Sequence, residues 1–170
     1  MADVLTAFPG ARRALFRKYH LGGCASCGFQ PTESLGELCA RNGGLNVAEV
    51  VAHITASHEQ DRQLEITPRE LAQRRARGEP VRLLDIRTRE EWDAVRLDGA
   101  EFVDQELVQT LMSRAAREGL LVFYDHSGTA SLDAAAYFAG HGFTQAKFLR
   151  GGIDAWAQEV EPKLPRYRLA

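Results

Sequence analysis

The order of segments in this chain predicts an α/β fold, in which helices flank a parallel sheet and a small all-α N-terminal domain comes first. After about residue 60, apolar runs of strand length alternate with helix-forming segments, which is typical of parallel strands joined by helices. Before that point the chain has short helical segments broken by Pro and Gly, together with all three cysteines. We therefore divide the 170 residues into a helical domain at 1–60 and an α/β domain at 61–170.

Composition and charge limit the functions that this chain could have. The formal net charge is −2 and charges of both signs are dispersed, which argues against nucleic acid as the main partner. No apolar run reaches the roughly 18 residues of a membrane-spanning helix. The N-terminus lacks the basic start and apolar core of a signal peptide, so we expect a cytoplasmic location. Cysteines there are more often thiols, redox groups or metal ligands than parts of a disulfide framework.

The first domain is expected to consist of short helices. They are predicted at 3–8, at 11–19 with Leu15 and Phe16 on the apolar side, from Thr32 as N-cap to about 41, and after Asn46 as N-cap. The apolar side of the last helix carries Val47, Val50, Val51 and Ile54. Because about 60 residues is a small core, docking, a metal or a homodimer could be needed to stabilise it.

The second domain alternates strands and helices. Strands are predicted at 64–66, 81–86, 120–124 and 146–149, and helices from Thr67 with Pro68 in first position, from Thr88, at 106–117, after Ser131 as N-cap, and at 153–158 after Gly151-Gly152. This alternation indicates a parallel sheet with helices on both faces. Ligands of such sheets bind beyond the C-terminal ends of the strands, which is where Asp125 falls.

The loop after the strand at 120–124 is the main candidate site. A strand, a short loop with glycine and a helix N-terminus together form a cradle of backbone N–H groups that can hold an anion. The residues of this loop are Asp125, His126, Ser127, Gly128, Thr129, Ala130 and Ser131.

Several motifs around this loop occur in an order that resembles the rhodanese-like domain family, which has the sulfurtransferase fold. They are Leu83-Leu-Asp-Ile-Arg87, Glu90-Glu-Trp92, Asp98-Gly-Ala100, Gly140-His-Gly-Phe143 and Leu149-Arg-Gly-Gly-Ile-Asp-Ala-Trp156. The resemblance covers roughly residues 64–165. In an active rhodanese the first loop residue is the cysteine that carries the persulfide, and the resemblance puts Asp125 at that position. It also puts Ala130 where an arginine is expected.

The aspartate changes what this loop can do. A thiolate can accept and release a sulfane sulfur, whereas a carboxylate cannot, so we expect no rhodanese turnover from the loop. One hypothesis is that the Asp125 carboxylate fills the anion cradle permanently and mimics the charged persulfide. The alternative is that Asp125 only caps the following turn, as Asp often does.

The remaining motif residues are expected to have structural roles. The resemblance implies that Asp85 and Arg87 tie strand ends together through charge-assisted hydrogen bonds. Trp92 and Trp156 are expected to anchor the core. Gly151-Gly152 is expected to form a tight turn that permits close packing.

Cys24 and Cys27 form a Cys-x-x-Cys motif between glycines, and Cys39 adds a third sulfur. Redox or persulfide chemistry at Cys24 and Cys27 is one interpretation, because this spacing lowers one thiol pKa and supplies a resolving partner. A zinc or Fe–S site is a second, with His20, His53, His58 or a second subunit completing the ligands. Simple packing is a third, above all for Cys39.

The leading functional prediction is a catalytically silent rhodanese-like protein that serves as a binding or regulatory platform in sulfur or thiol trafficking. Cys24 and Cys27 would be its reactive element, and a protein or sulfur carrier its partner. One alternative is an active sulfurtransferase or thiol–disulfide oxidoreductase that uses Cys24 or Cys27. Another is a metal- or Fe–S-binding accessory protein.

Overall fold

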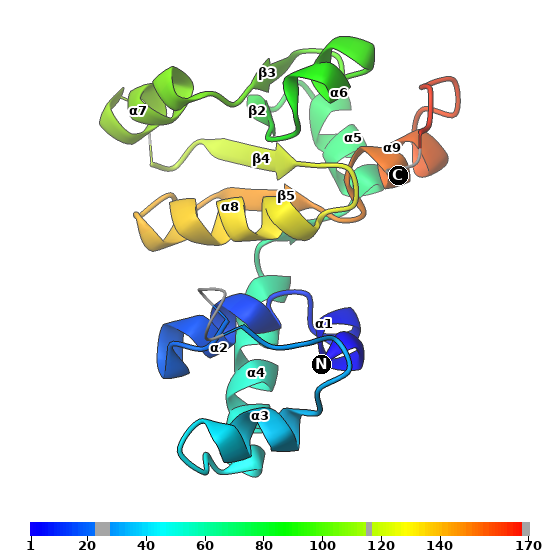
Figure 1. Ribbon diagram of the computed structural model, residues 1–170. Helices are drawn as coiled ribbons and strands as arrows, with labels where there is room; N and C mark the ends of the chain where they lie inside the picture. Colours follow the sequence, from blue (N-terminus) through cyan, green and yellow to red (C-terminus); the bar gives the residue numbers. More distant parts are fainter. Residues whose placement is uncertain (23–27, 115–116, 168–170) are drawn as a thin grey trace. The chain divides into compact units, whose positions relative to one another are not determined.

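The computed structural model describes residues 1–22, 28–114 and 117–167, and the chain divides into two compact units, Met1–Gln63 and Leu64–Ala170 (Figure 1). Cys24 and Cys27 lie outside the described residues. The first unit is helical and the second contains the sheet.

The described part of the first unit folds into helices α1 (Ala2–Ala7), α2 (Ala11–Tyr19), α3 (Leu35–Arg41) and α4 (Val47–Arg62). Its core is formed by Met1, Ala11, Leu15, Leu21, Phe29, Leu38, Cys39, Val50 and Ile54. Two expectations about α4 and α2 were wrong in part, because Val47, Val51 and Phe16 stay 41–48% exposed. An α-helix has 3.6 residues per turn, so Val50 and Ile54 lie on the same side of α4 and form its buried stripe. Val47 and Val51 lie at the margin of that stripe.

Helix α3 begins at a different residue from the one predicted. Its N-cap is Ser34, not Thr32. The Ser34 hydroxyl accepts the N–H of Glu37, and the Glu37 carboxylate accepts the N–H of Ser34 in return. This reciprocal pair requires an acidic residue three positions after the cap, which Thr32 lacks because Leu35 stands there. Asn46 caps α4 as predicted, by accepting the N–H groups of Ala48 and Glu49.

Five strands occur among the described residues of the second unit, and all pair in parallel in the order β1-β5-β4-β2-β3. The elements in chain order are β1 (Glu65–Ile66), α5 (Pro68–Ala76), β2 (Val81–Asp85), α6 (Arg89–Ala94), β3 (Ala100–Phe102), α7 (Gln105–Arg114), β4 (Leu120–Tyr124), α8 (Thr129–Gly140), β5 (Ala146–Leu149) and α9 (Gly152–Glu159). This confirms the predicted α/β class with a parallel sheet flanked by helices.

The residues of the central strand β4 alternate between two hydrophobic layers. Leu121 and Phe123 pack in a cluster with α7 and α8, while Val122 and Tyr124 pack in a cluster with α5 and α9. Side chains in a strand point alternately to opposite faces, so β4 is buried on both sides. Figure 1 shows α8 running alongside β5.

Three further features of the second unit differ from what the sequence led us to expect. Strand β3 was not predicted, because its three residues are only half buried and form no apolar run. Helix α7 is described over Gln105–Arg114, and Arg117, where the helix was expected to end, is already in a turn. The N-cap of α8 is Gly128, whose φ of +90° suits glycine, and not Ser131, which lies inside the helix.

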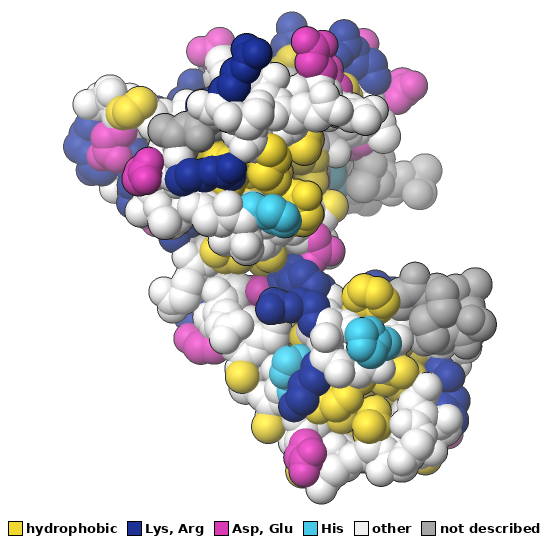
Figure 2. Space-filling view, turned by 90° about the vertical axis from the view of Figure 1, so that its left-hand side faces the viewer, with side chains coloured by type: hydrophobic (Ala, Val, Ile, Leu, Met, Phe, Trp, Pro, Cys, Tyr) yellow, Lys and Arg dark blue, Asp and Glu magenta, His cyan; other side chains and the backbone are white. Residues whose placement is uncertain are grey.

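Figure 2 shows one face of the second unit, on which basic and acidic side chains are interspersed. No described helix is both long and apolar enough to cross a membrane.

Candidate functional site

The candidate site lies at the C-terminal edge of the sheet, where β4 ends at the fully buried Tyr124. Asp125 follows directly and is only 9% exposed. The chain then turns through Gly128 and enters α8 at Thr129. Because all strands are parallel, the end of β2 at Asp85 and the end of β5 at Leu149 reach the same edge.

The Asp125 carboxylate is held by three donors from its own loop. Oδ1 accepts the N–H of Gly128 at 2.6 Å and the hydroxyl of Ser131 at 2.7 Å. Oδ2 accepts the N–H of Ala130 at 3.1 Å. Ser131 therefore donates to Asp125 instead of capping α8, and the carboxylate lies at the N-terminus of α8, where an anion is favoured.

The turn that precedes α9 supports this loop from behind. The carbonyl of Asp125 accepts the N–H of Ile153 at 2.9 Å, and the carbonyl of His126 accepts the N–H of Asp154 at 3.3 Å. A Cβ on Gly152 would lie 2.4 Å from both of these carbonyl oxygens, and one on Gly128 would lie 2.8 Å from the nitrogen of Gly151. The prediction that Gly151-Gly152 permits close packing is thus confirmed.

The other loop residues face in different directions. Ser127 and Thr129 are exposed at the tip, where their hydroxyls lie 3.3 Å apart, and Ala130 is exposed as well. His126 is partly buried, and its Nδ1 has no hydrogen-bond partner among the described residues. Its ring lies 4.6 Å, centroid to centroid, from the ring of Tyr167.

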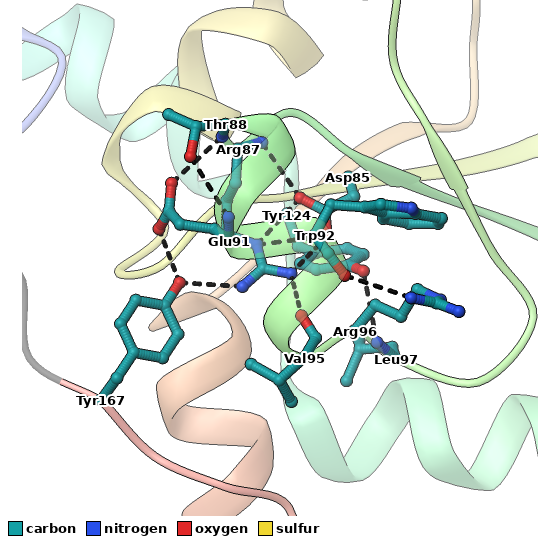
Figure 3. A network of polar contacts seen from close by, with 10 residues as sticks. All are labelled: Asp85, Arg87, Thr88, Glu91, Trp92, Val95, Arg96, Leu97, Tyr124 and Tyr167. Atoms are coloured by element: carbon teal, nitrogen blue, oxygen red, sulfur yellow. Dashed lines mark hydrogen bonds and ion pairs between the residues drawn. The ribbon is translucent and has the colours of Figure 1, made fainter.

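Beside the loop, a polar network is centred on Arg87 (Figure 3). Asp85 and Arg87 form a buried ion pair, in which Nε and Nη2 of the guanidinium donate to the carboxylate. Nη2 also donates to the carbonyl of Val95 at 2.6 Å. Burial alone would lower the pKa of Arg87, but hydrogen bonds with Asp85 and Tyr167 outweigh it and raise the pKa. The predicted charge-assisted hydrogen bonds between Asp85 and Arg87 are confirmed, and they connect the end of β2 to the residue after α6 and to Tyr167.

Two tyrosines complete the network. The hydroxyl of Tyr124 accepts the N–H of Leu97 at 3.3 Å, and burial together with the charge of Asp85 raises its pKa. The hydroxyl of Tyr167 accepts from Nη1 of Arg87 at 2.8 Å and donates to Glu91 at 2.6 Å. Burial, followed by the bond to Glu91, raises the pKa of Tyr167 to about 12. Both phenols therefore stay protonated at neutral pH.

Sequence reasoning missed Tyr167 entirely. It lies 76 residues from Glu91 and 80 from Arg87 in the chain, in a C-terminal segment without a repeating pattern. Of the two tryptophans, Trp156 is a buried core residue as predicted, whereas Trp92 is only partly buried against Phe102 and Arg96.

The proposed metal site includes Cys24 and Cys27, which lie outside the described residues, so only its other candidate ligands can be placed. No group of three or more His, Cys, Asp or Glu side chains that could hold a metal occurs among them. Cys39 is 1% exposed in the core of the first unit. His53 Nε2 lies 3.0 Å from the carbonyl of Ala14, His58 packs edge-on against Phe8, and His20 ends α2.

Comparison with known proteins identifies the class to which this fold and loop belong. The model of the rhodanese-like domain family matches residues 67–159, more than half of the chain. The chain therefore belongs to the rhodanese-like domain family.

Relatives of this chain carry sulfurtransferase names. A sulfurtransferase of Allochromatium vinosum is 37% identical over 98 residues, which cover 58% of this chain and 92% of that protein. The probable adenylyltransferase/sulfurtransferase MoeZ of Mycobacterium tuberculosis is 35% identical over 104 residues, which cover 60% of this chain. The aligned part is only 26% of the length of MoeZ, so the activities of that whole protein do not follow for this chain.

Solved structures agree on the fold. The human single-domain sulfurtransferase TSTD1 is similar with a TM-score of 0.51 and 24% identity, over 56% of this chain and 96% of that one. The rhodanese-like domain of an Anabaena protein is similar with a TM-score of 0.50 and 19% identity, over 63% of this chain and 91% of that one. At such identities the similarity concerns the fold alone.

Proposed function

We propose that this protein is a catalytically silent member of its family, which serves as a binding or regulatory platform in sulfur or thiol trafficking. Its partner would be another protein or a sulfur carrier, and Cys24 and Cys27 would be its reactive element. The observation that carries the proposal is the Asp125 carboxylate, which takes up the donors of its own loop.

The chemistry of the loop supports the absence of sulfurtransferase activity at residue 125. Sulfur transfer requires a nucleophile that accepts a sulfane sulfur and later releases it, which a thiolate does and a carboxylate does not. Residues 64–170 contain no cysteine that could replace Asp125. The second unit therefore lacks a sulfur nucleophile of its own.

The hydrogen bonds favour a self-filled cradle over a simple cap. A cap explains the N–H of Gly128, but the N–H of Ala130 and the hydroxyl of Ser131 also point at the carboxylate. These donors would otherwise be free to bind the negative charge of a bound group. Ala130 is consistent with this arrangement, because an occupied cradle needs no arginine for an external anion.

The Cys-x-x-Cys motif would supply the sulfur chemistry. A thiolate of the pair attacks the outer sulfur of a persulfide donor, forms a cysteine persulfide and releases the donor as a thiolate. The second cysteine can then attack the inner sulfur of that persulfide, which forms a disulfide and releases hydrosulfide. Two cysteines thus suffice to accept a sulfur atom and to discharge it.

A thiosulfate-to-cyanide transfer assay tests the silence of the loop. In the wild-type chain we expect no sulfur transfer that depends on residue 125. In the Asp125→Cys variant we expect sulfur transfer to appear, also when Cys24→Ser and Cys27→Ser are present in the same chain. Transfer that is lost in Asp125→Asn would contradict the proposal.

Mass spectrometry of protein purified without oxygen tests the cysteines. After incubation with a persulfide donor, we expect one additional sulfur atom on Cys24 or Cys27. An unmodified mass would remove these cysteines from the proposal, and stoichiometric zinc or iron would favour the metal-binding alternative.

The sulfurtransferase names of the relatives favour one second candidate, an active sulfurtransferase or thiol–disulfide oxidoreductase. Its nucleophile would be Cys24 or Cys27. Such an enzyme would lose its activity on Cys24→Ser or Cys27→Ser and would be indifferent to Asp125→Asn. A binding platform would show no turnover in any of these variants.

A further inference from the structure

The C-terminal segment of the described chain lies against the candidate site through side chains of two adjacent residues. Arg166 donates to both carboxylate oxygens of Asp154, from Nε at 2.7 Å and from Nη2 at 3.1 Å. The hydroxyl of Tyr167 lies between Glu91 and Arg87, as Figure 3 shows, and its ring contacts His126.

The surface under these two side chains is complementary to them in detail. Asp154 offers a carboxylate with the geometry that a guanidinium prefers. Glu91 offers an acceptor and Arg87 Nη1 a donor, which together suit a phenolic hydroxyl. The His126 ring offers a flat face for an aromatic ring. We call these four residues, Glu91, Arg87, His126 and Asp154, the Arg–Tyr groove.

The groove has space beside its present occupant. A cleft of about 310 Å³ is lined by His126, Asp154, Arg166 and Tyr167. The segment after α9 is neither helix nor strand where it is described, and Arg166 keeps half of its side chain exposed. A segment anchored through a few side chains can be exchanged for another of the same chemistry at a lower free-energy cost than a paired strand or a packed helix.

We propose that the Arg–Tyr groove is a recognition surface for an arginine–tyrosine segment of a partner protein, and that Arg166 and Tyr167 are its built-in competitor. The inference rests on the proposed binding role of this unit and names the chemistry of the partner. Only a few residues separate α9 from Arg166, so the tethered segment has an effective concentration on the order of millimolar. The apparent affinity for an external segment is reduced by the fraction of molecules whose groove is filled.

A fluorescent peptide with the sequence of residues 163–170 tests the proposal by anisotropy, against the full chain. The variant Arg166→Ala/Tyr167→Ala leaves the groove without its own segment. It should bind the peptide ~10-fold or more tightly than the wild-type chain does, because the tethered competitor is removed. Asp154→Asn, added to this variant, should weaken binding again. Tyr137→Ala, which removes an exposed tyrosine from α8, should bind as the wild type does.

The same peptide with alanine at the positions of Arg166 and Tyr167 is the ligand control and should not bind. Arg166→Gln alone, which keeps the contacts of Tyr167, should also increase affinity and serves if the double variant does not fold. A folded variant that binds the peptide no better than the wild type overturns the proposal.

A wild-type dimer that disappears in Arg166→Ala/Tyr167→Ala would assign the groove to the segment of a second copy, and would overturn the external partner. Since the readout is peptide binding and not sulfur transfer, its failure is distinguishable from failure of the proposed function, which the Asp125→Cys and persulfide experiments decide.

Discussion

The hydroxyl of Ser131 donates a 2.7 Å hydrogen bond to Oδ1 of Asp125, so the third residue of α8 is tied to the first residue of the loop before it. The same oxygen accepts the N–H of Gly128. Both contacts are buried. The carboxylate therefore stabilises the conformation of the loop, in addition to giving the loop a chemistry different from that of a cysteine.

Replacement of Asp125 by asparagine should destabilise the second unit. An amide has one acceptor oxygen where the carboxylate has two, so at least one of the three donors would face an NH₂ group, at a cost of about 1–3 kcal/mol. Denaturant unfolding followed by tryptophan fluorescence reports on this unit, because Trp92 and Trp156 both lie in it. The exposed Asp93→Asn is the control, and an Asp125→Asn variant as stable as the wild type would show that the second acceptor is dispensable.

Gly152→Ala should be far more disruptive than Gly142→Ala. Both glycines have positive φ, +59° and +89°, so both substitutions carry the strain of a left-handed alanine, about 1–2 kcal/mol. Only at Gly152 does the new Cβ meet two carbonyl oxygens at 2.4 Å, while nothing lies within 4 Å at Gly142. The difference between their unfolding free energies therefore measures the contact of the turn with the loop. Equal losses would mean that the loop moves aside freely.

Arg87→Met should cost about 3–5 kcal/mol of stability, because it leaves the fully buried Asp85 carboxylate without its charge partner. Arg82→Met provides a matched comparison. Arg82 also forms a bidentate pair, with Glu101, but both of those side chains are more than a third exposed, so the loss should be about 0–1 kcal/mol. Chemical denaturation of the two variants side by side would refute the argument if Arg82→Met were the more damaging.

The contact between Tyr167 and Glu91 should weaken in acid. Burial acts to raise the pKa of Glu91, but hydrogen bonds from Tyr167 and Thr88 outweigh it and lower the pKa. A lowered folded-state pKa contributes stability above the unfolded value of about 4.3, and that contribution is lost as the pH falls through the folded-state value. Tyr167→Phe should thus flatten the decline of the unfolding midpoint between about pH 5 and pH 3. An unchanged slope would exclude this contribution.

Cys39 should resist thiol reagents in the folded protein. It is 1% exposed, and burial raises the pKa of its thiol, so little reactive thiolate is present. Alkylation with iodoacetamide followed by peptide mapping should label Cys39 only after addition of denaturant. Early labelling of Cys39 under native conditions would show that the core of the first unit opens readily.

The sequence predicted elements where local chemistry determines them. Strand β4 is an uninterrupted apolar run, and Asn46 and Thr67 precede helices that they cap. Errors occurred where two local signals compete, as between Thr32 and Ser34, or where a distant partner decides, as for Ser131, which Asp125 engages. No local pattern could place Tyr167, because its partners are brought to it only by the folding of the whole second unit.

The position of Gly152 under the carbonyls of Asp125 and His126 sets a condition for protein engineering. The backbone conformation of the loop therefore depends in part on a later stretch of the chain, the turn at 151–152. Anyone who transplants residues 125–131 into another scaffold, or imports the corresponding loop of an active sulfurtransferase, should transfer the glycine pair at 151–152 with it. A graft without that pair would keep the residues of the loop but not its backbone conformation.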